Sequence, residues 1–214
     1  MVSEVAARAT QLLSQRFGDA IRVVVSDIEA RDDDLLEAER PHVARAVPKR
    51  RYDFAAGRRL ARTLLGPDVA LPSMPSRAPA WPPGVRGTIA HAGGLCVVAV
   101  TEAATSLGVD VEPWTPLAPG TARLVLSEAE RASLGPNADL DAKRAFCAKE
   151  AFFKAQWPLA QLRLDFLDAH VALFDDGFEI EPIVATPPAI EGRHRGFFVT
   201  VDDYVFAGLV ISAS

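Results

Sequence analysis

The stretch DLDAKRAFCAKEAFFKAQW, residues 139–157, carries the strongest helical pattern in the chain. Its large aromatic residues recur at helical spacings, which predicts a largely buried helix that ends at Pro158. Glu150 and Lys154 stand one turn apart on this helix, in the favourable order for an ion pair. Such pairs are common on protein surfaces, but a buried Lys and Glu need partners, and a metal ion or a phosphate would supply them.

Shorter elements are predicted on both sides of this helix. Apolar spacing predicts helices at residues 3–17 and 48–65 and strands at 22–28, 87–91, 95–101, 107–113, 164–174, 178–184, 196–202 and 204–212. A further helix is predicted to start at the acids 32–34 and to be interrupted by Pro41. Two blocks of a helix followed by strands therefore meet near residue 107. This order predicts an α+β fold with an N-terminal half, 1–106, and a C-terminal half, 107–214.

Composition excludes several classes of protein. The chain has 214 residues, 49% of them hydrophobic and 24% charged, which is the balance of a folded domain or two small lobes. A net charge of −5 argues against a nucleic-acid coat or a binder of anionic membranes. Residues 40–62 nevertheless hold eight Lys or Arg and one acid, a local charge of +7 that leaves −12 elsewhere. A basic segment in an acidic chain calls for an explanation that the average composition does not give.

The cysteines and the apolar runs indicate the compartment. Cys96 and Cys147 are too few for a disulfide framework and are expected to be buried. The longest strongly apolar run, Leu95 to Val100, is far shorter than the ~20 residues that span a bilayer. The N-terminus lacks a signal-peptide pattern. We therefore expect a cytoplasmic protein with reduced thiols and no membrane contact.

Two acidic residues on one strand form the first candidate site. In GVDVE, Asp110 and Glu112 are two residues apart and so share a face, while Val109 and Val111 turn to the core. Adjacent carboxylates repel one another unless a cation neutralises them, and oxygen ligands suit Mg²⁺. The alternative is a pair of solvated acids on an exposed strand.

The stretch WPPGVRGTIAH, residues 81–91, is a second candidate. His91 ends a predicted strand that also holds Thr88 and small residues, so a ligand can approach the backbone. The six prolines at 66–83 predict a stiff connection, which carries Arg77. Phosphate binding is one interpretation, and a structural histidine is the other.

Four motifs occur in a fixed order: RRYDFxxGRxxAR, RxPxWPxGxxGTIxH, GVDVE and FCAKEAxxK. Together they resemble the 4'-phosphopantetheinyl transferases, over about Arg50 to Pro158. Among these the chain is most similar to the long, monomeric type that activates enterobactin, surfactin and polyketide synthases. The resemblance implies two similar α+β halves related by a pseudo-twofold, with the ligand cleft between them.

The resemblance also implies a reaction and a metal site. Members of the family transfer the 4'-phosphopantetheine of coenzyme A to a serine of an apo acyl or peptidyl carrier protein and release adenosine 3',5'-bisphosphate. By similarity, Asp110, Glu112 and Glu150 would hold Mg²⁺, or Mn²⁺, against the diphosphate. The base that takes the serine proton is left open among Glu150, a metal-bound water and Glu130.

Coenzyme A would be held mainly by cations. The resemblance assigns the 3'-phosphate to Arg50, Arg58 and His91, with Arg77 as a further candidate. Thr88, Lys149 and Lys154 are also expected to bind coenzyme A, and Lys154 would act in catalysis by steadying the leaving phosphate. Ala90 departs from the family, since relatives often carry Ser or Thr there, so one contact to the phosphate would be lost. The partners expected are carrier domains and coenzyme A, with no nucleic acid. A coenzyme A-binding protein without transfer activity and a Mg²⁺-dependent phosphodiesterase are the alternatives.

Overall fold

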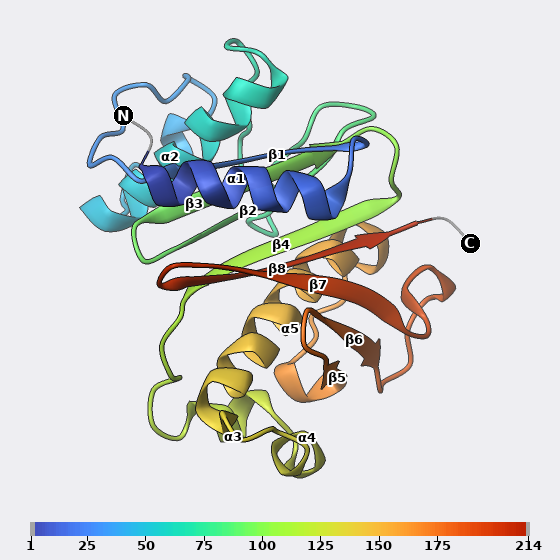
Figure 1. Cartoon of the computed structure of the whole chain (residues 1–214). Coiled ribbons are helices and arrows are strands. Elements are labelled where there is room, and N and C mark those ends of the chain that lie inside the picture. Colours follow the sequence, from blue (N-terminus) through green and yellow to red (C-terminus); the bar gives the residue numbers. More distant parts are fainter. Residues whose placement is uncertain (1–2, 213–214) are drawn as a thin grey trace.

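The computed structural model describes residues 3–212 and has two antiparallel sheets with helices packed on them (Figure 1). One sheet has the order β1-β3-β2 and the other β4-β8-β7-β6-β5. The strands are β1 (Ile21–Asp27), β2 (Arg86–Ala92), β3 (Leu95–Thr101), β4 (Ser106–Pro113), β5 (Ala169–Leu173), β6 (Gly177–Pro182), β7 (His194–Val201) and β8 (Tyr204–Ile211). The α+β class is thereby confirmed. The division into two similar halves at residue 107 stays a prediction.

The helices begin and end where local chemistry favours it. They are α1 (Glu4–Phe17), α2 (Pro48–Leu65), α3 (Thr121–Val125), α4 (Glu128–Ala132) and α5 (Ala138–Ala160), with short 3₁₀ turns η1 (Arg40–Val43), η2 (Phe166–Asp168) and η3 (Pro188–Ile190). Ser3 caps α1 by accepting a hydrogen bond from the amide of Ala6. Proline opens α2, and Gly66 follows its last residue.

Three sequence predictions differ from the structure. No helix starts at the acids 32–34: the chain is irregular at Asp32 and turns at 33–34, and the carboxylates of Asp32 and Asp34 bond to arginines of α2. Helix α5 continues through Pro158 to Ala160, since a proline in the last turn removes only one amide donor. The strand expected at 164–174 shortens to β5, preceded by η2, where Asp165 and Asp168 cap one another.

The core is continuous between the two sheets. Helix α5 packs against β4 and β8, and α2 packs against β3. Helix α1 lies along β1 and also contacts β7 of the other sheet, where Ala9 and Leu13 join a buried cluster with Val109 and Phe197 (Figure 1). Strands β2 and β4 meet at the seam, where the amide of Val109 donates to Thr88 Oγ1 at 3.3 Å. Within residues 3–212 no helix is both long and apolar enough to cross a membrane.

Gly108 on β4 allows the closest contact in this core. A Cβ at this position would lie 1.9 Å from the carbonyl oxygen of Ala151 on α5, well inside van der Waals distance. Only glycine permits this approach of strand and helix. The approach matters for the site because Asp110 and Lys154 follow Gly108 and Ala151 within a few residues.

We predict that Gly108→Ala destabilises the protein by about 3 kcal/mol or more, because the added methyl forces α5 away from β4. Urea unfolding followed by circular dichroism measures the change. Gly135→Ala is the control: Gly135 is exposed, and its Cβ would meet only the flexible carboxylate of Asp141. Equal unfolding free energies for the two variants would contradict the role assigned to Gly108.

Candidate active site

A cleft of about 1150 Å³ lies between the proline-rich loop with β2 on one side and the second half of α5 on the other. Its polar and charged lining residues are Arg50, Ser76, Arg77, Arg86, Thr88, Thr105, Glu150, Lys154 and Gln161. Four of these are cations and only Glu150 is an acid. A cleft of this composition favours a ligand with several negative charges.

The cations of the cleft come from four different elements. Arg50 belongs to α2, Arg77 lies in the proline-rich loop, Arg86 is on β2 and Lys154 is on α5. Sequence reasoning did not single out Arg86, although it lies within the quoted motif. The alternation of the strand could have found it, because Arg86 stands two residues before Thr88 and so shares its face.

Aromatic side chains form the apolar part of the cleft. Trp81 lies on one wall, and Phe153 and Trp157 lie on the other. The indole of Trp81 packs directly on Gly87, where a Cβ would come within 2.6 Å of the ring. This contact explains why tryptophan and glycine occur together in the motif, and the stacked loop makes a firm wall.

Arg50 and His91 approach one another at the cationic end. Arg50 Nη1 lies 3.4 Å from His91 Nε2, and His91 Nδ1 lies 3.9 Å from the carboxylate of Asp53. Burial lowers the pKa of His91, and the positive charge of Arg50 lowers it too, against the opposing effect of Asp53. His91 is therefore neutral at pH 7, and Arg50 supplies the positive charge of this pair.

Arg58 points to the proline-rich loop and is not among the residues that line the cleft. Its guanidinium lies 3.6 Å from the ring centre of Phe54, and Nε donates to the carbonyl of Leu71 at 3.0 Å. Nη2 donates to Ser73 Oγ at 3.3 Å. Burial lowers the pKa of Arg58 to about 10, which still leaves it charged at pH 7.

Four of the eight cations in the basic segment 40–62 are paired with acids. The pairs are Lys49 with Asp53, Arg51 with Asp32, Arg59 with Asp34, and Arg62 with Glu39. The local charge of +7 therefore does not face the cleft as a whole. Arg50 is the residue of this segment that lines it.

The carboxylates of β4 are held by lysines of α5. Lys154 Nζ donates to Asp110 Oδ1 at 2.6 Å, and Lys143 Nζ donates to Glu112 Oε2 at 2.9 Å. Burial lowers the pKa of Lys154, but the charges of Asp110 and Glu150 outweigh this effect and raise it overall. Burial raises the pKa of Glu150 and of Glu112. Lys143 was not expected from the sequence, since its partner lies 31 residues away.

Comparison with known protein families matches both parts of the chain. The N-terminal domain model of 4'-phosphopantetheinyl transferases covers residues 38–101, and the model of the 4'-phosphopantetheinyl transferase superfamily covers 106–207. The 4'-phosphopantetheinyl transferase Svp of Streptomyces mobaraensis is 41% identical over 174 residues, which are 75% of this chain and 70% of Svp.

The chain belongs to the 4'-phosphopantetheinyl transferase superfamily.

Two further relatives bear the same family name. The transferase is 39% identical to Npt of Nocardia iowensis over 67% of its own chain and 66% of that protein. It is 36% identical to PptT of Mycobacterium tuberculosis over 66% of each. These similarities do not distinguish the enterobactin- and surfactin-activating type from other members.

The predicted metal ligands are only partly gathered in the transferase. Within residues 3–212, no three His, Cys, Asp or Glu side chains are grouped so that they could hold a metal ion. Lys143 and Lys154 neutralise Glu112 and Asp110 instead. The donor set still suits a hard cation, because Asp110 Oδ2 is buried without any hydrogen-bond partner, and such an oxygen calls for a cation or a donor.

Glu130 and Lys149 form a separate buried pair. Lys149 Nζ lies 2.8 Å from Glu130 Oε1 and also donates to the carbonyls of Val125 and Phe166. Both side chains are almost fully buried, and neither lines the cleft. Burial alone would raise the pKa of Glu130, but the bonds from Lys149 and from backbone amides outweigh it and lower the pKa. The structure therefore does not bring this pair together with the cleft residues.

We predict that Lys149→Met lowers the free energy of unfolding by about 3–5 kcal/mol, because it leaves Glu130 charged, buried and unpaired. Urea unfolding measures this. The KM for coenzyme A of the folded variant should stay near that of the wild type. Arg8→Met is the control, since Arg8 and its partner Asp202 are both exposed and their ion pair contributes under about 1 kcal/mol. A large rise in the KM for coenzyme A without loss of stability would instead show that Lys149 contributes to coenzyme A binding.

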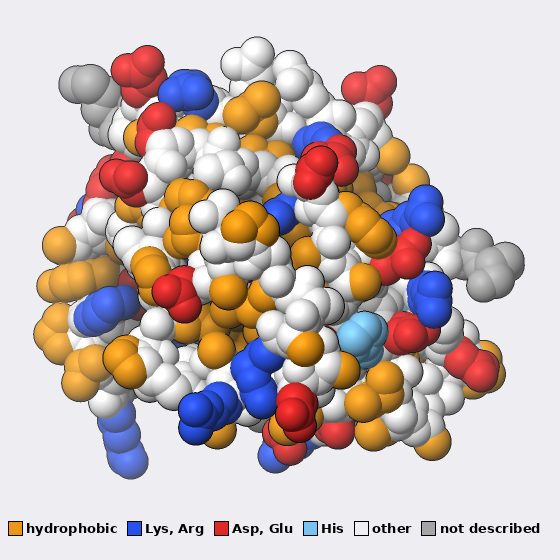
Figure 2. Space-filling model, turned by 60° about the horizontal axis from the view of Figure 1, so that its bottom comes forward, with side chains coloured by type: hydrophobic (Ala, Val, Ile, Leu, Met, Phe, Trp, Pro, Cys, Tyr) orange, Lys and Arg blue, Asp and Glu red, His pale blue; other side chains and the backbone are white. Residues whose placement is uncertain are grey.

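The face seen in Figure 2 bears on the phosphodiesterase alternative. Lys and Arg side chains lie there among Asp, Glu and hydrophobic side chains, with no broad field of one sign. A nucleic-acid substrate usually requires an extended basic surface. On this face the structure does not favour that alternative.

Proposed function

We propose that the transferase uses this cleft to move the 4'-phosphopantetheine of coenzyme A onto a serine of an apo carrier protein. The observation that carries the proposal is the cleft itself: Arg50, Arg77, Arg86 and Lys154 converge on one space beside Glu150. Coenzyme A has a 3'-phosphate and a diphosphate joined by an adenosine, so it needs cations at two separate places. We further infer a cytoplasmic location, consistent with two buried free cysteines, Cys96 and Cys147. The resemblance to the long transferase type supports a monomer.

The 3'-phosphate is assigned to the end of the cleft formed by α2 and the proline-rich loop. Arg50 and Arg77 supply guanidinium groups, which match phosphate oxygens in geometry as well as charge. Neutral His91 lies against Arg50 and orients it or donates one hydrogen bond. Arg58 acts indirectly, because it holds the proline-rich loop that carries Arg77.

The diphosphate is assigned to the other end, near α5. Lys154 lines the cleft while bonded to Asp110, so its charge is fixed where the diphosphate would lie. Asp110, Glu112 and Glu150 would hold Mg²⁺ or Mn²⁺ there, and a bound ion would neutralise charge on the diphosphate during transfer. Thr88 lies at the seam between these ends, with its hydroxyl accepting from Val109.

The transfer exchanges one phosphorus–oxygen bond for another. The serine oxygen bonds to the phosphorus that bears the pantetheine arm, and the bond from that phosphorus to the bridging oxygen breaks, which releases adenosine 3',5'-bisphosphate. The serine proton must leave, and Glu150 is our candidate to accept it. Burial raises the pKa of Glu150, which makes it a stronger base than an exposed carboxylate, and it lines the cleft.

The carrier is proposed to belong to a nonribosomal-peptide, polyketide or siderophore synthase. The ordered motifs of the long transferase type support this assignment. Fatty-acid carriers are the alternative class, and relative rates on several apo carriers would separate them.

We predict that incubation with coenzyme A, Mg²⁺ and an apo carrier domain adds the mass of one phosphopantetheine to the carrier. Glu150→Gln should abolish this gain while coenzyme A still binds, because the variant keeps the shape of the side chain and loses its charge. Mass spectrometry of the carrier and calorimetry of coenzyme A binding provide the two measurements. No mass gain with any carrier class would exclude the proposed function.

We predict that Arg50→Ala and Arg77→Ala each raise the KM for coenzyme A about tenfold, the value of one charged hydrogen bond. Neither should raise the KM for dephospho-coenzyme A, which lacks the 3'-phosphate. Arg45→Ala, at an exposed residue just before α2, is the control and should change neither constant. Equal rises in KM for coenzyme A and dephospho-coenzyme A would show that these arginines contact a part of the ligand other than the 3'-phosphate.

A further inference from the structure

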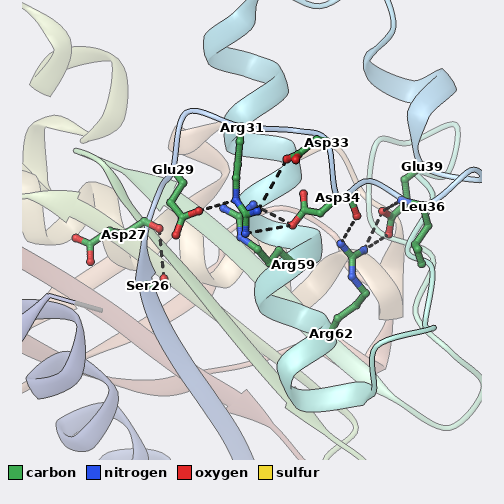
Figure 3. A network of polar contacts seen from close by, with 10 residues as sticks. All are labelled: Ser26, Asp27, Glu29, Arg31, Asp33, Asp34, Leu36, Glu39, Arg59 and Arg62. Carbon is green, nitrogen blue, oxygen red and sulfur yellow. Dashed lines mark hydrogen bonds and ion pairs between the residues drawn. The ribbon is translucent and has the colours of Figure 1, made fainter. Parts of the chain in front are cut away.

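A buried carboxylate outside the cleft joins three segments of the N-terminal half. Glu39 is 0% exposed, and its oxygens accept hydrogen bonds from the amides of Leu36 and Leu71 at 3.0 and 2.9 Å. Arg62 of α2 donates to both oxygens, at 2.9 and 3.1 Å, as Figure 3 shows. All of these donors belong to the chain itself, so Glu39 is not positioned to bind a ligand.

Leu71 is the point at which this carboxylate reaches the proline-rich loop. Leu71 is fully buried and lies outside any strand or helix. Its amide donates to Glu39, and its carbonyl accepts from Arg58 Nε at 3.0 Å. The backbone amide and carbonyl of Leu71 are therefore both hydrogen-bonded to charged side chains. In a sheet, a neighbouring strand would supply these partners.

Beyond Leu71 the chain folds back on itself as a narrow hairpin. The amide of Ala80 donates to the carbonyl of Pro72 at 2.9 Å, and the amide of Met74 donates to Ala78 at 2.8 Å. The tip holds Arg77, whose φ of 71° lies in the left-handed region. Residues 76–79 at this tip line the cleft. The position of Arg77 is thus set by the base of the hairpin, at Leu71.

We propose that Glu39, held by Arg62, is a positioning residue for coenzyme A: it fixes the base of the hairpin and so the place of Arg77 in the cleft. The inference rests on the proposed function, since it takes coenzyme A as the ligand of that cleft. Releasing the amide of Leu71 would let the hairpin shift as a unit. Coenzyme A binding would then weaken, while the rate of the transfer step at α5 would change little.

The test is Glu39→Gln in the full-length protein. The amide side chain keeps the size of glutamate but presents an NH₂ group to one of its former donors. We expect KM and Kd for coenzyme A to rise about tenfold, with kcat within about twofold and the KM for the carrier unchanged. Hydrogen exchange of the peptide that contains Leu71 should speed up in parallel.

Asp34→Asn is the matched control. Asp34 belongs to the same polar network and pairs with Arg59 at 3.0 Å (Figure 3), whereas the amide of Leu71 donates to Glu39. This variant should lose some stability and keep the KM for coenzyme A. If Glu39→Gln behaves as Asp34→Asn does, the role of Glu39 is only structural and the proposal fails.

Two further measurements keep the test decisive. Should Glu39→Gln fail to fold, Arg62→Lys loosens the same carboxylate while keeping a cation beside it, and it must also weaken coenzyme A binding. Calorimetry with coenzyme A does not depend on turnover. If the wild type binds coenzyme A but transfers nothing, the proposed function fails while the Kd of the variants still supports or overturns the role of Glu39.

Discussion

The contact of β4 with α5 at Gly108 is the constraint on which the site depends. Without a side chain at this position, the strand backbone reaches the helix backbone directly. Residues on either side of this contact then come within bonding distance, so that Lys154 meets Asp110 and Lys143 meets Glu112. Any residue larger than glycine would separate the acids of the strand from the cations of the helix.

Strand β4 also joins the two sheets. It pairs with β8 on one side and meets β2 on the other through Thr88, and its first six residues are buried. Helix α1 strengthens this junction, because it packs on β1 of one sheet and β7 of the other. The cleft therefore has walls from both parts of the chain, and its two ends can bind different groups of one long ligand.

Charge in the N-terminal part of the chain falls into two groups. The first group pairs acids of residues 32–39 with arginines of α2, which fixes a segment that has little regular structure. The second group is the cationic lining of the cleft, of which Arg50 and Arg77 are members. Glu39 connects the two groups, since it is bonded both to Arg62 and to the base of the loop that carries Arg77.

The sequence alone determined the elements whose signals are local. Apolar spacing and capping residues placed α2 at residues 48–65, and the alternation of β4 put Asp110 and Glu112 on one face, because such patterns act over a few residues. The ordered motifs indicated the family, which the comparisons confirm.

Only the tertiary structure decided which charges are free to act. The sequence of the basic segment 40–62 does not reveal whether its charges face a ligand or another part of the protein. The same is true of the KE dipeptide at 149–150. The fold pairs Lys149 with Glu130 and Arg62 with Glu39, while Arg50, Glu150 and Lys154 line the cleft. Ion pairs between residues 19 or more positions apart depend on how distant segments pack, and no local pattern encodes that packing.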